Sequence, residues 1–195
     1  MDVKKMAGIV ALILVVLWII GRVASKQSQN SAVSAAQSGQ STPQDKWVVK
    51  EDRSSMDDSR VVTLSLDSED VIQGPIGPKR PSLIVRCKEG KTVVYVATGM
   101  AAAVEDHDGL LADDHTIRIR LDRGEAQTQL WSESTSHSAL FSLDGIQLAK
   151  QLAGARTMTF QFMPFDANPA VMRFDLRGLD AHLLKVAEAC GWTMN

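Results

Sequence analysis

Short runs of alternating apolar and polar residues recur along most of the chain after its first 46 residues, as in β-strands that bury one face. Residues 115–121 alternate cleanly, with Ile117, Ile119 and Leu121 on one face. The other runs are residues 60–66, 83–87, 92–98, 157–163 and 170–176. Gly, Pro, Asp and Asn separate these runs, as expected of turns. The spacing predicts an antiparallel β-sandwich or a barrel-like domain.

Two segments instead repeat their apolar residues with the period of an α-helix. The first helix is expected over residues 144–154, with Asp144 as its N-cap. The second is expected over residues 180–191, with Asp180 as the cap and Gly191 as the stop signal. The predicted fold class is therefore mainly β (α+β), with two short helices.

The N-terminus carries an uninterrupted apolar run that begins at Met6 and ends at Gly21. With its flanking residues it can span a bilayer core of ~30 Å as a single helix. It is also short enough for the core of a signal peptide, so a cleaved leader is the alternative. Arg22 follows the run directly, where a cleavable signal carries small neutral residues, and this favours an uncleaved anchor.

The next twenty or so residues are rich in Ser and Gln and show no periodic apolar pattern, so burial cannot offset the entropy of ordering them. We therefore divide the chain into a single transmembrane helix (residues 1–24), a disordered linker (residues 25–46) and a β-rich domain (residues 47–195). The predicted arrangement is a single-pass protein of a bacterial inner membrane with its C-terminal domain in the periplasm.

The chain has only two cysteines, Cys87 and Cys190, and both lie in the β-rich domain. A lone pair of cysteines behind an export-like N-terminus predicts one disulfide bond in an oxidising compartment. Two buried thiols in a reduced protein are the alternative. A bridge that closes a loop of about a hundred residues would contribute up to ~4.7 kcal/mol, and it would fasten the C-terminal helix to the sheet.

The net charge and the positions of the basic residues limit the classes of partner. The net charge is −2 and there is no basic stripe, which argues against a nucleic-acid partner. Arg118 and Arg120 fall on the polar face of an alternating strand, where a solvated face accounts for them.

Three groups of residues could in principle carry chemistry. Asp57 and Asp58 could share a proton or hold a cation, but a turn-forming role suits these residue types better. The stretch 113–115 together with residues 106–108 lacks the spacing of metal ligands. His137 lies near the hydroxyls of residues 134, 135 and 138, but no nucleophile motif surrounds it. We therefore expect no enzymatic activity, no cofactor and no metal.

The order of several short signatures resembles the VasI/TagO-type family of proteins associated with bacterial type VI secretion. Five signatures are continuous segments: residues 47–49, 53–59, 118–122, 174–179 and 189–192. Another combines residues 83–87 with Thr92 and Tyr95. The last combines Trp131, Ser134 and Thr135 with residues 139–141. The resemblance implies an envelope-facing domain without established catalytic residues, and relatives also occur in phage and prophage genomes. A cleaved export signal would be the more ordinary start in this family, so Arg22 is a departure.

Three functions remain in view. The first is a non-enzymatic, membrane-tethered periplasmic accessory protein that binds an envelope protein through residues such as Arg53, Met56, Asp57, Asp58 or Trp131. The second is a phage- or prophage-encoded envelope protein that acts in superinfection exclusion or host modification. The third is a cell-wall hydrolase or ligand-binding protein. Burial in the core is the alternative role for Trp131.

Overall fold

The computed structural model describes residues 45–74, 76–103 and 114–194. The chain from Asp45 onward forms one compact unit. Its strands are β1 (Val48–Arg53), β2 (Arg60–Asp67), β3 (Ile72–Gly74), β4 (Gly77–Lys79), β5 (Ser82–Lys88), β6 (Lys91–Ala97), β7 (Asp114–Leu121), β8 (Gln127–Glu133), β9 (Ala139–Ser142), β10 (Thr157–Phe162) and β11 (Ala170–Asp175). Its two helices are α3 (Gly145–Ala153) and α4 (Leu179–Cys190).

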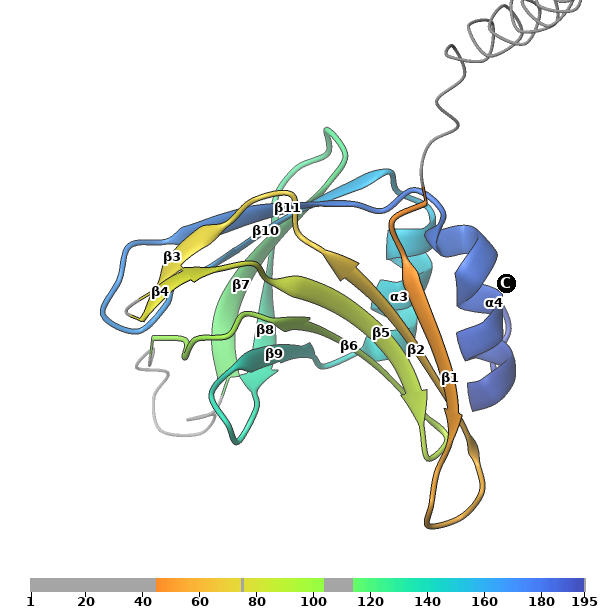
Figure 1. The fold of residues 1–195 in the computed structure, drawn as a ribbon. Coiled ribbons are helices and arrows are strands. Elements are labelled where there is room, and N and C mark those ends of the chain that lie inside the picture. The colour runs from red at the N-terminus through yellow and green to blue at the C-terminus, as the bar shows by residue number, and fades with distance from the viewer. Residues whose placement is uncertain (1–44, 75, 104–113, 195) are drawn as a thin grey trace, which may run out of the picture. The chain divides into compact units, whose positions relative to one another are not determined.

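Nine of the strands form one antiparallel sheet in the order β1-β2-β5-β6-β9-β8-β7-β10-β11. The short strands β3 and β4 pair only with each other. The large sheet folds over on itself, so that its two halves face each other across one hydrophobic core (Figure 1). The architecture is thus mainly β with two helices, consistent with the predicted β-sandwich.

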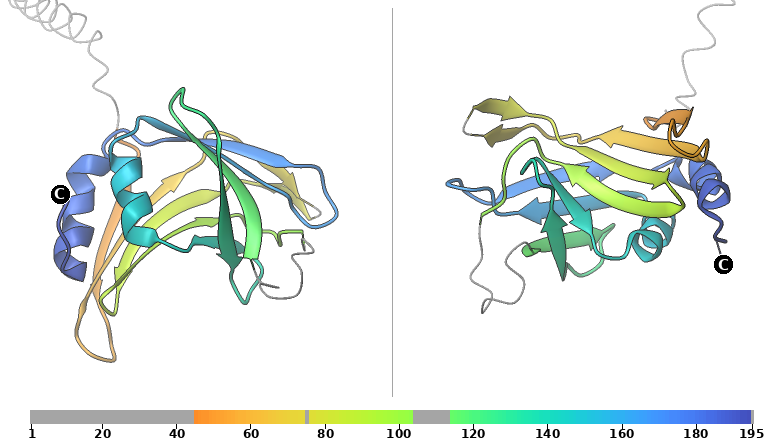
Figure 2. Two further views of the ribbon diagram at one scale, coloured as in Figure 1. Left: turned by 180° about the vertical axis from the view of Figure 1, so that it is seen from behind. Right: turned by 90° about the horizontal axis from the view of Figure 1, so that it is seen from below.

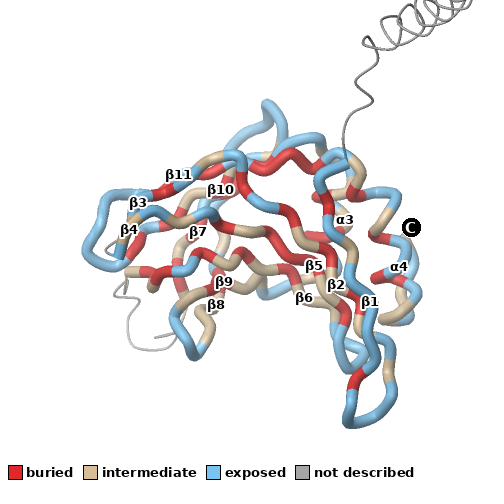
Figure 3. Tube along the Cα trace, in the orientation of Figure 1, coloured by how far each residue is buried: buried red, intermediate tan, exposed pale blue. Residues whose placement is uncertain are grey.

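Strict alternation along the strands builds the core. Val62, Leu64 and Leu66 of β2 are buried and face the interior, while the residues between them lie toward the outer face. Buried side chains follow the same period on β7, β10 and most of β11, whereas on β5 the consecutive residues 83–85 are all buried (Figure 3). Trp131 of β8 meets Phe160 of β10 edge to face, with ring centroids 5.2 Å apart. This contact spans β7, which lies between the two strands in the sheet.

The two helices lie at one end of the folded sheet (Figure 2). Helix α4 packs on β2 and β5, whereas α3 packs on β6 and touches α4. Cys190, the last residue of α4, forms a disulfide with Cys87 of β5, whose side chain is fully buried. The C-terminal helix is therefore covalently joined to the interior face of the sheet.

The predicted runs agree with β2, β5, β6, β7, β10 and β11, and both helices are present. Asp144 caps α3 as predicted, because its carboxylate accepts the Gln147 N–H at 3.0 Å. The predicted cap of α4 was wrong: Gly178 holds that position with φ 91°, and Asp180 lies in the first turn. A Cβ at Gly178 would come within 2.8 Å of the Asp45 carboxylate, so the bend requires glycine.

Residues 73–78, a Gly- and Pro-rich segment between two predicted runs, form most of the short β3–β4 hairpin. The sequence also gave no prediction of strands at β1, β8 or β9. The anchor, most of the linker and the acidic stretch at residues 106–108 lie outside the described residues. Within the described part of the chain, no helix has the length and apolar character needed to cross a membrane.

Candidate functional site

The turn between β1 and β2 gathers four of the predicted interaction residues: Arg53, Met56, Asp57 and Asp58. Main-chain hydrogen bonds fix its shape, because the Ser54 N–H donates to the Ser59 carbonyl at 2.9 Å and the Asp58 N–H donates to the Ser54 carbonyl at 3.0 Å. Asp58 has φ 56°, a left-handed conformation that Asp tolerates better than most residues. The polar sequence thus forms one tight turn.

The polar side chains of this turn bind the turn itself. The Asp57 carboxylate accepts the Ser59 hydroxyl at 2.8 Å and the Ser59 N–H at 3.2 Å. Hydrogen bonds from Ser54 and Ser59 lower the pKa of the Asp57 carboxyl, whereas a proton shared with Asp58 would raise it. The Arg53 guanidinium donates to the Asp58 carbonyl at 3.2 Å. The carboxylate of Asp57 therefore has the turn-forming role.

Met56 lies at the tip of this turn with 88% of its surface exposed. Its N–H donates to the Ser54 hydroxyl oxygen at 3.3 Å, so the backbone beneath the side chain is held in place. The β1–β2 hairpin projects past the neighbouring β5–β6 hairpin in Figure 1 and in the left view of Figure 2. The fold thus presents a flexible apolar side chain on a fixed, projecting turn, a combination suited to insertion into a partner's pocket.

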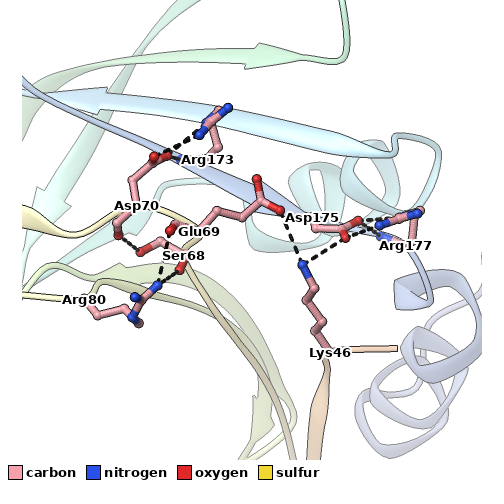
Figure 4. A network of polar contacts seen from close by, with 8 residues as sticks. All are labelled: Lys46, Ser68, Glu69, Asp70, Arg80, Arg173, Asp175 and Arg177. Atoms are coloured by element: carbon pink, nitrogen blue, oxygen red, sulfur yellow. Dashed lines mark hydrogen bonds and ion pairs between the residues drawn. The ribbon is translucent and has the colours of Figure 1, made fainter. Parts of the chain in front are cut away.

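A second polar cluster, which the sequence did not predict, lies where the two edges of the large sheet approach each other (Figure 4). The Lys46 ammonium lies 3.3 Å from Glu69 and 3.3 Å from Asp175. The Arg177 guanidinium donates to both oxygens of Asp175. Together with a smaller contribution from Lys46, this pair lowers the pKa of the nearly buried Asp175 carboxyl to about 2.

The same cluster continues along β11 to the segment after β2. The Arg173 guanidinium forms two 3.0 Å hydrogen bonds with the Asp70 carboxylate. Its main chain also takes part, since the Arg173 N–H donates to Asp70 and the Glu69 N–H donates to the Arg173 carbonyl. Arg80 donates to the Ser68 carbonyl at 2.6 Å. The bonds to Arg173 join the segment after β2 to β11, so the cluster has a structural role.

Only part of this cluster could be recognised in the sequence. Asp175 and Arg177 fall within the signature at residues 174–179, but their partners Lys46 and Glu69 lie more than a hundred residues away. Only the fold brings them together.

In the sequence, His137 lies near the hydroxyls of residues 134, 135 and 138, but the structure gives it a different partner. His137 pairs with the Glu133 carboxylate and not with a neighbouring hydroxyl. Glu133 also accepts the Ala102 N–H at 2.6 Å, and the Nδ1 atom of His115 lies 2.8 Å from the Ala103 carbonyl oxygen. Within residues 45–74, 76–103 and 114–194, no three His, Cys, Asp or Glu side chains gather in a metal-binding group.

The tryptophans have separate roles. Trp131 is fully buried, so it supports the core and offers no exposed contact. Trp47 is also buried, and its indole N–H donates to the Leu176 carbonyl at 3.4 Å. The indole N–H of Trp192 donates to the Thr92 hydroxyl at 2.8 Å. Of the predicted interaction residues, only those of the β1–β2 turn lie together at the surface.

Comparison with solved structures finds invasion-associated protein B from Bartonella henselae, at a TM-score of 0.46 and 8% sequence identity. The alignment covers 73% of this chain and 92% of that protein. No curated protein matches the chain significantly. The sequence does match the family described as type VI secretion system VasI, EvfG, over residues 19–192. Since this match covers most of the chain, the protein belongs to the VasI family of type VI secretion-associated proteins.

Proposed function

We propose that this protein is a non-enzymatic accessory protein of type VI secretion that acts by binding another envelope protein through its β1–β2 turn. The observation that carries the proposal is the exposure of Met56 on a turn in which the Arg53 and Asp57 side chains already form hydrogen bonds within the turn. A turn built in this way loses little conformational entropy on binding, because its backbone is already ordered. Asp57 and Asp58 beside Met56 favour a partner pocket with a basic rim.

We further propose that residues 1–24 anchor the protein in the inner membrane and that the domain lies in the periplasm. The apolar run that ends before Arg22 supports the anchor. The bond between Cys87 and Cys190 supports an oxidising compartment, since such bonds are rare in reduced cytosol. The Ser- and Gln-rich linker would let the domain reach a partner above the membrane surface.

The turn can be tested with a matched pair of substitutions. Met56→Glu places a charge on the β1–β2 turn, and Ile76→Glu places one on a different turn at a residue that is 90% exposed. We expect Met56→Glu to abolish secretion in a deletion strain that the wild-type gene restores, and Ile76→Glu to restore it fully. Neither charge is buried, so each variant should keep its free energy of unfolding within about 0.5 kcal/mol of the wild type.

Normal secretion by the Met56→Glu strain would reject the turn as the contact surface. Equal loss of secretion with both variants would also reject it, because the effect would then not depend on this turn. Protein abundance and the unfolding midpoint of each variant provide the control for misfolding.

A further inference from the structure

Strand β8 has a partner along only part of one side. It pairs with β7 from Gln127, opposite Ile119, to Ser132, opposite Asp114. On the other side its pairing with β9 begins only at Trp131, opposite Ser142. After β9 the chain turns away into α3, and no strand of the described chain lies beside residues 127–129 on that side. The first half of β8 is therefore an open edge inside an otherwise continuous sheet.

The register shows which main-chain groups face this open side. The Ser134 N–H donates to the Ala139 carbonyl, so Ser134 directs its main-chain groups toward β9. Main-chain groups alternate sides along an antiparallel strand, so Ser132 and Thr128 point the same way. The N–H and C=O of Thr128 therefore face the open edge, where an added strand could pair with them.

A groove runs between this edge and helix α3. Two adjoining hollows of about 440 and 280 Å³ share the lining residues Gln127, Gln129, Leu148 and Gln151. In the left view of Figure 2, α3 and the β7–β8 hairpin stand side by side. The space next to the open edge is thus a surface groove with a strand on one wall and a helix on the other.

The groove walls are rich in side-chain amides. Gln127 and Gln129 come from β8, and Gln147 and Gln151 come from α3. The Gln129 amide oxygen already accepts the Trp131 indole N–H at 3.1 Å, so this side chain offers its NH₂ group. An amide side chain both donates and accepts hydrogen bonds, which matches the alternating N–H and C=O groups of an extended polypeptide. Buried Leu148 contributes an apolar surface between them. Polar main-chain pairing with room for alternate side chains is the chemistry of peptide recognition by strand addition.

The charges around the groove are unequal. Among the residues that line the two hollows, Asp122, Glu125 and Asp144 contribute three carboxylates and Lys150 contributes one ammonium. Arg118 lies opposite Thr128 on β7 and is not part of this lining. The Lys150 ammonium also lies over the Trp192 ring, 5.5 Å from its centroid. An occupant with a Lys or Arg side chain is therefore favoured over an acidic one.

We propose that this groove binds an extended, basic segment of a partner protein, which adds a strand to the open edge of β8 at Thr128. The groove shares no residue with the β1–β2 turn, so this inference stands independently of the contact proposed there.

A library of random ten-residue peptides displayed on phage, selected on the purified full-length chain, tests the proposal. We expect enrichment of peptides that contain Lys or Arg and alternate apolar residues. A synthetic peptide of the enriched sequence should slow amide hydrogen exchange at Thr128 at least tenfold. Thr128→Pro removes the N–H on the open side and leaves the pairing with β7, so it should weaken peptide binding at least tenfold. Thr128→Ala, which keeps the N–H, should bind within twofold of the wild type.

The proposal fails if no peptide is enriched, or if the enriched peptide binds wild type and Thr128→Pro equally. Two other occupants of the open edge would be recognised by their effects on amide exchange. Slower exchange at Thr128 with rising protein concentration, without peptide, would assign the edge to a second copy of the chain. Faster exchange after deletion of residues 25–44 would assign it to the chain's own linker, and either result overturns the proposal. If Thr128→Pro lowers the unfolding midpoint, Gln151→Trp provides a second block of the groove from the helix side.

Discussion

Asp175 shows how a single side chain contributes to the closure of the sheet. Its carboxylate is nearly buried and is bound by the Arg177 guanidinium and the Lys46 ammonium. A buried carboxylate is stable only when its charge is matched in this way. Removing that charge leaves Arg177 and Lys46 without their shared partner.

We expect Asp175→Asn to lower the free energy of unfolding at pH 7. The pKa falls from 3.8 to about 2, and this shift corresponds to about 2 kcal/mol. A lowered folded-state pKa contributes stability that is present above pH 4 and is lost as the pH falls toward 2. Urea unfolding of wild type and variant should therefore differ at pH 7 and converge near pH 2. A difference that persists unchanged to pH 2 would assign the effect to lost packing.

The sequence predicted which side chains are exposed better than it predicted which side chains bind each other. Arg118 and Arg120 are exposed, as their place on the polar face of a strand indicated. The turn-forming role of Asp57 followed from the local chemistry of Asp and Ser. The pairing of Asp70 with Arg173 could not be predicted, because 103 residues separate them and no local pattern links the two.

Of the two helix N-caps predicted from local sequence, the cap of α3 was correct and the cap of α4 was wrong. Asp144 has both the position and the side-chain geometry of an N-cap. At α4 the chain enters through Gly178 in a left-handed conformation, which places Asp180 inside the first turn. Glycine adopts this conformation without the penalty of a Cβ. The Asp45 carboxylate that lies against Gly178 is a tertiary contact.

The two aspartates therefore differ in their expected effects. Asp144→Ala should lower the free energy of unfolding by about 1 kcal/mol, because the Gln147 N–H loses its acceptor. Asp180→Ala removes only a favourable charge near the helix N-terminus and should lower it by about 0.3 kcal/mol. Chemical unfolding of both variants at pH 7 measures the difference. Equal effects would contradict the assignment of the caps.

The missed strands have a common physical reason. Strand β1 carries four charged residues in a row at the edge of the sheet, and the first half of β8 is exposed. Strand β9 has only four residues. Burial of one face produces the alternation that identifies a strand, so edge, exposed and short strands lack it.

At the scale of the whole molecule, the disulfide joins residues that are 103 positions apart. We expect Cys87→Ala combined with Cys190→Ala to lower the free energy of unfolding by about 2–5 kcal/mol, since the reduced chain gains freedom when unfolded. Amide exchange at Leu183 and Val186 of α4 should rise at the same time.

Reduction of the wild-type protein should give the same loss of stability as the double substitution. A double variant as stable as the oxidised wild type would show that packing alone holds α4 on the sheet.

The way the sheet folds over on itself could not be predicted from the sequence. The six recognised strands indicated a sandwich or barrel, but the order β1-β2-β5-β6-β9-β8-β7-β10-β11 depends on pairings between distant segments. The contact between Glu69 and Arg173, which brings the two edges together, is of this kind. The candidate contact turn was easier to predict because all its hydrogen bonds are local.

The place of α4 near the end of the chain also has a consequence for biosynthesis. Leu183 and Val186 fill the interior against β2 and β5, which are made about a hundred residues earlier. A nascent chain that stops before residue 179 leaves that apolar surface uncovered and the Cys87 thiol without its partner. The domain can therefore complete its core only after synthesis reaches the last helix.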